Sequence, residues 1–249
     1  MQVDGDGRVT GFEYKPDSPS SDIVTTEVFV FEATALMATL RELAEEDERD
    51  DEEESDRLED FGHALLPRLV DRGAALDYRL DDYWKDLGTV QSYWEAHMDL
   101  LGDAPAITLD DPRWPIYTLA VQRPPARIEA TAAIDDSLVS PGCTVAGEVH
   151  RSIIAPGSVI KPGAVVRDSV VLHDCVIGSG ATVDVAVVDM EVRIDASATV
   201  GRRLARGLQD PSNDDITVIG RAAHIGAGST VAVGARVEPN SAVGRGGGA

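Results

Sequence analysis

The chain has 249 residues, of which 43% are hydrophobic, so it can bury a core and is not globally disordered. Its 44 acidic residues outnumber 22 basic ones, and the resulting net charge of −22 repels nucleic-acid backbones and anionic membrane surfaces. We therefore expect neither nucleic-acid nor membrane binding. No apolar run approaches the roughly 20 residues that span a bilayer. The first residues also lack the basic start and apolar run of a signal peptide, which predicts a cytoplasmic location.

The first 119 residues alternate between strand-like and helix-like segments, as in an α/β domain. Strands rich in β-branched or aromatic residues are expected at 9–14, 23–31 and 75–80. Apolar residues at helical spacing predict helices over 36–43, 61–69 and 90–101, with Thr89 as the N-cap of the last. The acidic run 45–60 carries mostly like charge and is expected to be a solvated loop.

From residue 120 onward the sequence is a repeat with one aliphatic residue in every six. The repeat runs through 153, 159, 165, 171, 177 and 183, resumes at 188, 194 and 200, and resumes again from 219 to 243; the pairs 128 and 134, and 139 and 145, continue it upstream. This period is typical of a left-handed parallel β-helix of triangular section, in which each hexad forms one side of a coil. Residues 207–215 are predicted to be a loop between coils.

The two cysteines fit the same pattern. Cys143 and Cys175 each lie four residues after an aliphatic residue, in the position that small residues occupy in other repeats. We therefore expect both to be packing residues inside the β-helix, and neither a disulfide nor a metal site.

Several strings of the first region resemble the glucose-1-phosphate adenylyltransferase family, which makes ADP-glucose for glycogen synthesis. They are VTGFEYKPDSPSSDIVTTEVFVF, DFGHALLPRLV, DYWKDLGTVQSYWEAHMDLL, DDPRWPIYT and PPARI, in the family's order and leading into the same β-helix. The resemblance implies a partial nucleotidyltransferase (Rossmann-like) domain over 1–119 and a β-helix over 120–249. It also implies that ATP and glucose 1-phosphate are the substrates, that Mg²⁺ is the cofactor, and that the oligomer is a homotetramer.

The resemblance assigns roles to two residues. Asp86, in YWKDLGT, matches the family's metal-binding aspartate, and Lys15, in EYKP, matches the lysine that pairs with the sugar phosphate. Nucleotidyl transfer builds negative charge on phosphate oxygens, so a magnesium ion and a lysine are the groups that this chemistry needs. On residue type alone, Asp86 could equally be a turn residue and Lys15 an exposed strand-end lysine. No residue is assigned as catalytic.

Three further positions of the expected sugar site depart from the family or vary within it. Tyr14 stands where the family has a glutamate that accepts a sugar hydroxyl, and Glu13 lies one place away, on the opposite face of a strand. Thr25 keeps the hydroxyl of the family's serine, whereas Glu27 replaces a glycine and could fill part of the pocket. These changes put the identity of the substrate in question.

The family's glycine-rich nucleotide-binding loop and its second metal-binding aspartate are not found in the sequence. We therefore expect this chain alone to have little or no activity. A split or truncated gene product, a wrongly assigned start, and a subunit completed by a partner chain carrying the amino-terminal half all explain this pattern.

Two other functions are compatible with the sequence. One is a non-catalytic scaffold or regulatory subunit, and the other is a hexapeptide acyltransferase that uses His150, His173 or His224 as a base. All three histidines take non-aliphatic positions of the repeat, where solvent exposure is the simpler expectation. Trp84, Trp94 and Trp114 are expected in the core or at the domain junction, and Arg127 is a candidate for an anionic regulator site.

Overall fold

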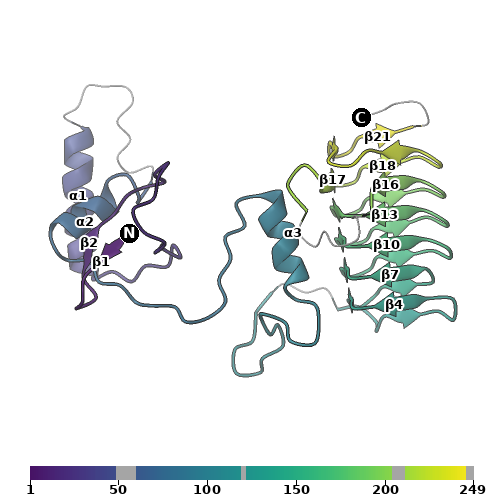
Figure 1. Cartoon of the computed structure of the whole chain (residues 1–249), viewed down its shortest axis with the longest axis horizontal. Helices are drawn as coiled ribbons and strands as arrows, with labels where there is room; N and C mark the ends of the chain where they lie inside the picture. The colour runs from purple at the N-terminus through teal and green to yellow at the C-terminus, as the bar shows by residue number, and fades with distance from the viewer. Residues whose placement is uncertain (49–59, 119–121, 204–210, 245–249) are drawn as a thin grey trace. The chain divides into compact units, whose positions relative to one another are not determined.

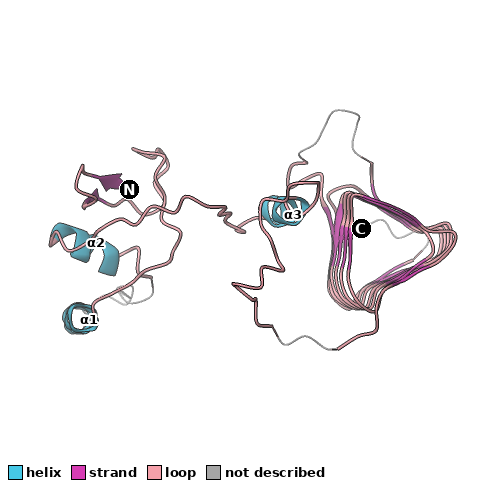
Figure 2. Cartoon of the chain, turned by 90° about the horizontal axis from the view of Figure 1, so that it is seen from below, coloured by secondary structure: helices cyan, strands magenta, loops and turns pink. Residues whose placement is uncertain are grey.

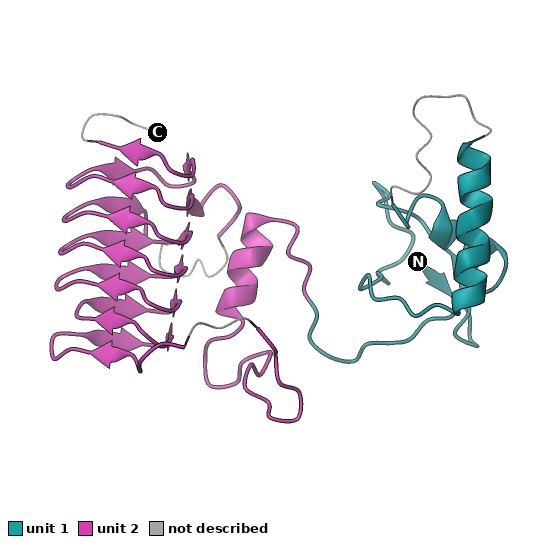
Figure 3. Ribbon diagram, turned by 180° about the vertical axis from the view of Figure 1, so that it is seen from behind, with its two compact units in different colours: residues 1–84 teal, residues 85–249 magenta. Residues whose placement is uncertain are grey.

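The computed structural model describes residues 1–48, 60–118, 122–203 and 211–244. The chain divides into two compact units, Met1–Trp84 and Lys85–Ala249, which Figure 3 shows in two colours. Most of the predicted acidic loop lies outside the described residues, but its first residues are helical. None of the described helices has the length and apolar character that crossing a membrane requires.

The first unit holds a two-stranded antiparallel sheet and two helices. The strands are β1 (Gln2–Val3) and β2 (Val9–Gly11), and the helices are α1 (Ala33–Asp47) and α2 (Leu65–Asp71) (Figure 1). The two helices contact each other and bury Leu43 and Leu65. Arg68 adds a bidentate ion pair to Glu46, with N–O distances of 3.0 and 2.7 Å. The predicted helices over 36–43 and 61–69 are thus confirmed, although the second begins four residues late.

Two of the three strands predicted in this unit do not form. Residues 23–31 contain no strand, and the side chains of Val24, Val28 and Val30 are 63%, 78% and 99% exposed. Residues 75–80 contribute only a single bridge, between Arg8 and Leu76. β-branched residues favour a strand only when a neighbouring strand pairs with its backbone. Within the described residues of this unit, no strand lies beside 23–31.

The second unit is a parallel β-helix with one helix, α3 (Val90–Met98), on its outside. Figure 2 looks along the coils and shows their triangular section. The three sheets are named here by their first strands. The β4 sheet contains β4 (Ala133–Asp135), β7 (Glu148–His150), β10 (Val165–Arg167), β13 (Thr182–Asp184), β16 (Thr199–Gly201) and β19 (Thr230–Val231).

The β5 sheet contains β5 (Leu138–Val139), β8 (Ile153–Ile154), β11 (Val170–Val171), β14 (Ala186–Val188), β17 (Thr217–Ile219) and β20 (Arg236–Val237). The β3 sheet contains β3 (Arg127–Ile128), β6 (Thr144–Val145), β9 (Val159–Ile160), β12 (Val176–Ile177), β15 (Arg193–Ile194), β18 (His224–Ile225) and β21 (Ala242–Val243). The predicted fold class, a partial α/β region followed by a hexapeptide β-helix, is confirmed.

Branched aliphatic side chains fill the β-helix, but the predicted register is wrong in its first part. Ile154, Ile160 and Val166 are fully buried, whereas their predicted neighbours at 153, 159 and 165 are partly exposed. The reason is that the side from the β4 sheet to the β5 sheet is one residue short. Val166 and Val171 are its inward residues, five apart, and Val171 pairs with Val188, 17 residues on instead of 18.

A ladder of buried serines closes this short side. After β7 and β10 one residue takes a left-handed backbone, Arg151 with φ 43° and Asp168 with φ 48°, and the next is a buried serine; after β13 the left-handed Val185 is followed by Ala186. Ser169 donates its hydroxyl to the Arg167 carbonyl at 2.6 Å and accepts the Ala186 N–H at 3.1 Å. Ser152 repeats both bonds in the coil before. In each case the hydroxyl gives a backbone N–H its acceptor, whereas the carbonyl to which it donates also accepts an N–H from the next coil.

α3 belongs to the β-helix unit because its apolar face covers the outside of the β5 sheet. Trp94 is 1% exposed, packs with Val170 and Val187, and donates its ring N–H to the Asp168 carbonyl at 2.7 Å. The Arg151 guanidinium lies 5.2 Å from the Trp94 ring. The compact unit begins at Lys85, and the domain boundary at 119/120 stays a prediction from the sequence.

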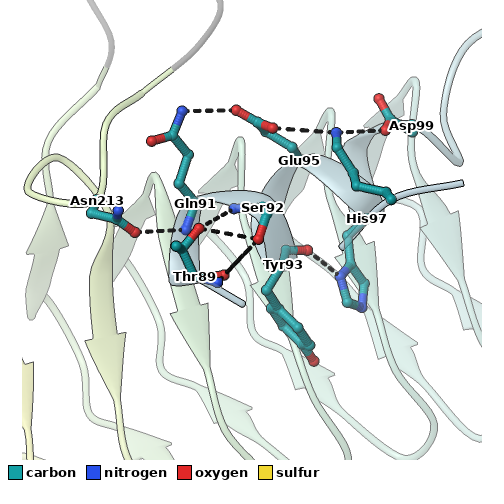
Figure 4. A network of polar contacts seen from close by, with 9 residues as sticks. Thr89, Gln91, Ser92, Tyr93, Glu95, His97, Asp99 and Asn213 are labelled. Atoms are coloured by element: carbon teal, nitrogen blue, oxygen red, sulfur yellow. Dashed lines mark hydrogen bonds and ion pairs between the residues drawn. The ribbon is translucent and has the colours of Figure 1, made fainter. Parts of the chain in front are cut away.

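The chain that interrupts the coils also contacts α3. Residues 207–210 of the predicted loop lie outside the described residues, but Asn213 accepts the Gln91 backbone N–H at 2.9 Å (Figure 4). Arg236 donates to the Asn213 carbonyl at 2.8 Å and so holds this turn. Thr89 and Ser92 form a capping box at the same helix end, which confirms the predicted N-cap.

Both cysteines lie in the β-helix core, as predicted. Cys143 and Cys175 are free thiols with 1% and 0% exposure. Burial raises the pKa of Cys175 to about 12 and also raises the pKa of Cys143. A buried thiol with a raised pKa carries little thiolate near neutrality, which disfavours both residues as nucleophiles.

Replacing a buried corner serine by alanine will destabilise the β-helix. In Ser169→Ala, the Arg167 carbonyl and the Ala186 N–H both lose a partner in the interior, at a cost of about 1–3 kcal/mol. Thermal unfolding followed by far-ultraviolet circular dichroism measures the loss. Ser179→Ala, at an exposed corner serine, is the matched control and should unfold like the parent. Equal thermal unfolding midpoints for the two variants would contradict a stabilising role of the Ser169 hydroxyl.

The two thiols will resist an aromatic disulfide reagent at mildly alkaline pH until the chain unfolds. The raised pKa keeps each folded thiol protonated, and burial excludes the reagent. Reagent absorbance with and without denaturant tests this, with two thiols expected to react in denaturant. Rapid reaction of the folded chain would show that a cysteine is accessible.

Candidate functional site

Lys15 stands where the chain turns after β2. Its backbone has φ 42°, a left-handed conformation that is uncommon for a residue with a side chain, and its side chain is exposed. Pro16 follows and disfavours a helical conformation at Lys15. Backbone conformations of this kind are costly and are found disproportionately at functional sites.

Tyr14 connects this turn to the segment before α2. Its hydroxyl donates a hydrogen bond to the Asp60 carboxylate at 2.5 Å, and its ring lies 4.4 Å from the His63 ring, centroid to centroid. The ring also lies directly over Gly62, where an added Cβ would come within 2.1 Å of it. Glycine is therefore required at position 62 for Tyr14 to reach Asp60.

Charge is concentrated around the same ring. The Lys15 ammonium lies 4.8 Å from the centre of the Tyr14 ring. Tyr14 raises the pKa of Lys15, with smaller contributions from the carboxylates of Asp60 and Glu27. The hydrogen bonds from Tyr14 and from the Gly62 N–H lower the pKa of Asp60. At neutral pH the cluster therefore presents an ammonium and a carboxylate, both ionised.

Glu27 and Thr25 form a turn of their own. Thr25 accepts the Glu27 backbone N–H on its hydroxyl at 3.0 Å, and Glu27 has φ 59°. The position that is glycine in the resembled family thus keeps a backbone conformation that suits glycine. Glu13 accepts a hydrogen bond from Ser20 at 2.9 Å, and both Glu13 and Tyr14 lie beyond the end of β2, so the strand-face argument does not apply to them.

Asp86 lies in the second unit, just before α3. Its side chain is exposed, and a Cβ on Gly88 would come within 3.1 Å of its carboxylate. The Lys85 ammonium instead lies 3.2 Å from Glu95 of α3 and 2.8 Å from Asp99. The structure thus brings together Tyr14, Lys15 and Glu27 in one unit and carries Asp86 on the other.

The residues present fit a magnesium ion held partly by substrate. Nowhere in the described residues do three acidic, histidine or cysteine side chains gather to form a complete metal cage. Magnesium commonly takes one or two protein carboxylates and completes its shell with water and phosphate oxygens. The exposed carboxylate of Asp86 meets the first of these requirements.

Asp60 and His63 were missed by the sequence-based prediction. Both lie in the string DFGH, which carried the family resemblance but was assigned no role. The sequence feature that could have indicated Asp60 is Gly62, two residues later, because a glycine can mark a place where another group approaches the backbone closely. Contact with Tyr14, 46 residues earlier, depends on the fold.

The histidines of the repeat all lie on the outside of the β-helix, as expected. His224 pairs with Asp195 at 2.7 Å and His150 with Glu148 at 3.3 Å, while His173 is exposed. Arg127 is also mostly exposed and lies 3.6 Å from Glu129.

The expectation for the tryptophans holds only for Trp94. Trp84 and Trp114 are 44% and 82% exposed, because neither packs into the core of the unit that contains it.

Comparisons with known proteins cover both parts of the chain. A family model described as nucleotidyl transferase matches residues 1–102, and one described as GlmU-like, C-terminal hexapeptide matches residues 124–219. The chain belongs to the sugar nucleotidyltransferase family. The first match crosses from one compact unit into the other, so α3 is part of the family's nucleotidyl transferase region although it packs on the β-helix.

Relatives in this family include glucose-1-phosphate adenylyltransferases. The protein of Thermomicrobium roseum is 41% identical over 221 residues, which are 87% of this chain and 50% of that protein. The protein of Desulforamulus reducens is 34% identical over 81% of this chain and 49% of the relative, and that of Acetivibrio thermocellus is 31% identical over 96% and 55%. The chain spans about half the length of these curated relatives.

Replacing Glu27 by glycine will stabilise the first unit. The left-handed backbone costs a residue with a Cβ roughly 1–2 kcal/mol, and glycine removes most of this cost. Glycine also gives the unfolded chain more conformational freedom, which offsets part of the gain, so the free energy of unfolding should rise by about 0.5–1 kcal/mol. Denaturant unfolding followed by circular dichroism measures it. Glu13→Gly, at an exposed position without positive φ, should destabilise instead. The same sign for both variants would contradict the argument.

Proposed function

We propose that this protein acts in glucose-1-phosphate adenylyl transfer, in which ATP and glucose 1-phosphate yield ADP-glucose and pyrophosphate for glycogen or α-glucan synthesis in the cytoplasm. The observation that carries the proposal is the turn after β2, where the Lys15 ammonium lies over the Tyr14 ring and the Glu27 carboxylate helps to raise the pKa of Lys15, in a string that matches the family. The similarity to glucose-1-phosphate adenylyltransferases of several bacteria supports the choice of sugar and nucleotide.

In this proposal Lys15 holds the phosphate of the sugar. Its ammonium is exposed, and its raised pKa keeps it charged at any physiological pH. An ammonium stabilises a phosphate oxygen electrostatically, and the left-handed backbone of the turn sets the direction in which the Lys15 side chain leaves the chain. Thr25 and Glu27 form the neighbouring wall, where the Glu27 carboxylate can accept a sugar hydroxyl.

Asp86 is proposed as a ligand of the magnesium ion. A magnesium ion held by Asp86 would supply positive charge that stabilises the charge developing on the phosphates. The capping box of Thr89 and Ser92 starts α3 three residues after Asp86, and packing of Trp94 fixes that helix on the β-helix. Asp86 is therefore presented from a rigid support.

The first unit is also proposed to pack against the nucleotide-binding half of the domain. The exposed valines of 23–31 form a strand-like sequence without a neighbouring strand among the described residues of this unit. The relatives contain about twice the length that matches this chain. We propose that a strand of the nucleotide-binding half, carried by this polypeptide or by a partner chain, pairs with residues 23–31. We also propose that the assembled protein is a homo-oligomer such as a tetramer.

A second candidate is a scaffold or regulatory subunit. The observation in its favour is that the second unit has a complete, well-packed core, whereas the first leaves its predicted strand unpaired. Retained substrate binding without turnover in any complemented assembly would select this candidate.

The chain will show pyrophosphate release from ATP, glucose 1-phosphate and Mg²⁺ when it is co-expressed with the amino-terminal half of the Thermomicrobium roseum relative, and little when assayed alone. Lys15→Ala and Asp86→Asn should each lower the complemented rate by about 10²–10³-fold, since each removes charge stabilisation of the transition state. Lys161→Ala, at an exposed lysine of the β-helix, is the control and should keep the rate.

Two results would count against the proposal. One is a folded, complemented assembly that releases no pyrophosphate. The other is full activity in Lys15→Ala. Manganese binding, followed by water proton relaxation, gives an independent readout, in which Asp86→Asn should weaken the bound signal.

A further inference from the structure

The insertion between β16 and β17 contacts the start of α3. Asn213 accepts the Gln91 backbone N–H on its side-chain oxygen at 2.9 Å (Figure 4). This N–H belongs to the first helical turn, where a helix has no acceptor of its own. Thr89 supplies the acceptor for the Ser92 N–H in the same turn, at 3.0 Å. The start of α3 is therefore capped twice, once by its own segment and once by the β-helix.

The turn that carries Asn213 is held in place by contacts that do not involve the start of α3. Arg236, from β20, donates a hydrogen bond to the Asn213 carbonyl at 2.8 Å. The Asp215 carboxylate accepts the Ser212 hydroxyl at 2.7 Å and the Ser212 backbone N–H at 3.1 Å. Ile216, which leads into β17, is fully buried. The Asn213 side chain therefore reaches α3 from a fixed turn.

Asp86 lies close to this doubly capped helix end. Only Leu87 and Gly88 separate it from the N-cap Thr89, and a Cβ on Gly88 would come within 3.1 Å of the Asp86 carboxylate. The position of the first turn of α3 therefore limits where the Asp86 carboxylate can lie. Magnesium requires a nearly ideal octahedral geometry, so a displaced carboxylate binds it less well.

We propose that Asn213 is a positioning residue for the candidate magnesium ligand Asp86, because its side-chain oxygen fixes the start of α3 on the β-helix. The inference rests on the proposed function, in which Asp86 holds the ion. Asn213 acts through α3, so its loss should change the magnesium concentration that the reaction needs more than the rate at saturating magnesium.

The test is a magnesium titration of pyrophosphate release by the chain co-expressed with the amino-terminal half of the Thermomicrobium roseum relative. Asn213→Ala removes the acceptor and should raise the Mg²⁺ concentration for half-maximal rate about fivefold, the effect expected from the loss of one helix cap. Asn213→Asp keeps an oxygen acceptor and adds a charge that suits a helix N-terminus, so it should behave like the parent.

Asn240→Ala is the matched control, because Asn240 is the only other asparagine of the chain and is exposed at the corner before β21. It should leave the magnesium requirement unchanged. Thermal unfolding of each variant checks that it is folded.

Hydrogen–deuterium exchange of the chain alone gives a readout that does not depend on activity. Asn213→Ala should speed exchange in the peptide covering 86–98 and leave exchange in the coils over 144–177 as in the parent. Manganese binding to the complemented assembly, followed by water proton relaxation, gives a second readout. Because Asn213 acts through Asp86, adding Asn213→Ala to Asp86→Asn should not weaken manganese binding further.

Three results would overturn the positioning role. They are a parental magnesium requirement in Asn213→Ala, an equal loss in Asn213→Asp, and unchanged exchange over 86–98 in Asn213→Ala. If any of these occurs while the complemented parent chain releases pyrophosphate, the role of Asn213 is wrong and the proposed function stands. If the folded, complemented parent chain releases none, the proposed function falls, and this inference falls with it.

Discussion

The stacking of one branched aliphatic side chain per strand inside a three-sided coil is the constraint on which the second unit depends. Each inward residue contacts its counterparts in the coils before and after, so the interior is continuous from Val145 to Val243. Burial of these side chains supplies the main favourable free energy, about 25 cal/mol for each Å² removed from water. The sheets on the three sides are thin, and they hold together because this column fills the space between them.

The short side of the coil shows how polar backbone groups find hydrogen-bond partners beside the apolar interior. A side of five residues places a left-handed residue and an inward serine at the corner, as at Asp168 and Ser169. The Ser169 hydroxyl then accepts the Ala186 N–H and adds a second donor to the Arg167 carbonyl, which also accepts the Val185 N–H. The same corner offers the Asp168 carbonyl to Trp94, so the device that closes the coil also provides an anchor for α3.

The candidate site in the first unit rests on a smaller number of contacts. Lys15, Tyr14 and Asp60 come from segments far apart in the chain, and Gly62 lets them meet because it has no side chain. Two residues with side chains, Lys15 and Glu27, take left-handed backbones beside this cluster. The free-energy cost of a left-handed backbone at a residue with a side chain is one that proteins often accept at ligand-binding sites.

The sequence by itself determined the β-helix, its inward cysteines, the N-cap at Thr89 and the family, because each depends on local spacing or on short strings of residues. It also indicated Lys15, Tyr14 and Glu27, which the structure brings together. Other features were decided by tertiary structure. The register of the early coils follows from a corner that is one residue short. No strand among the described residues of the first unit lies beside 23–31, so β propensity alone did not make this segment a strand. α3 joined the β-helix because the outer side of the β5 sheet is apolar, and Asp60 entered the site because a fold, not a motif, placed its carboxylate against the Tyr14 hydroxyl.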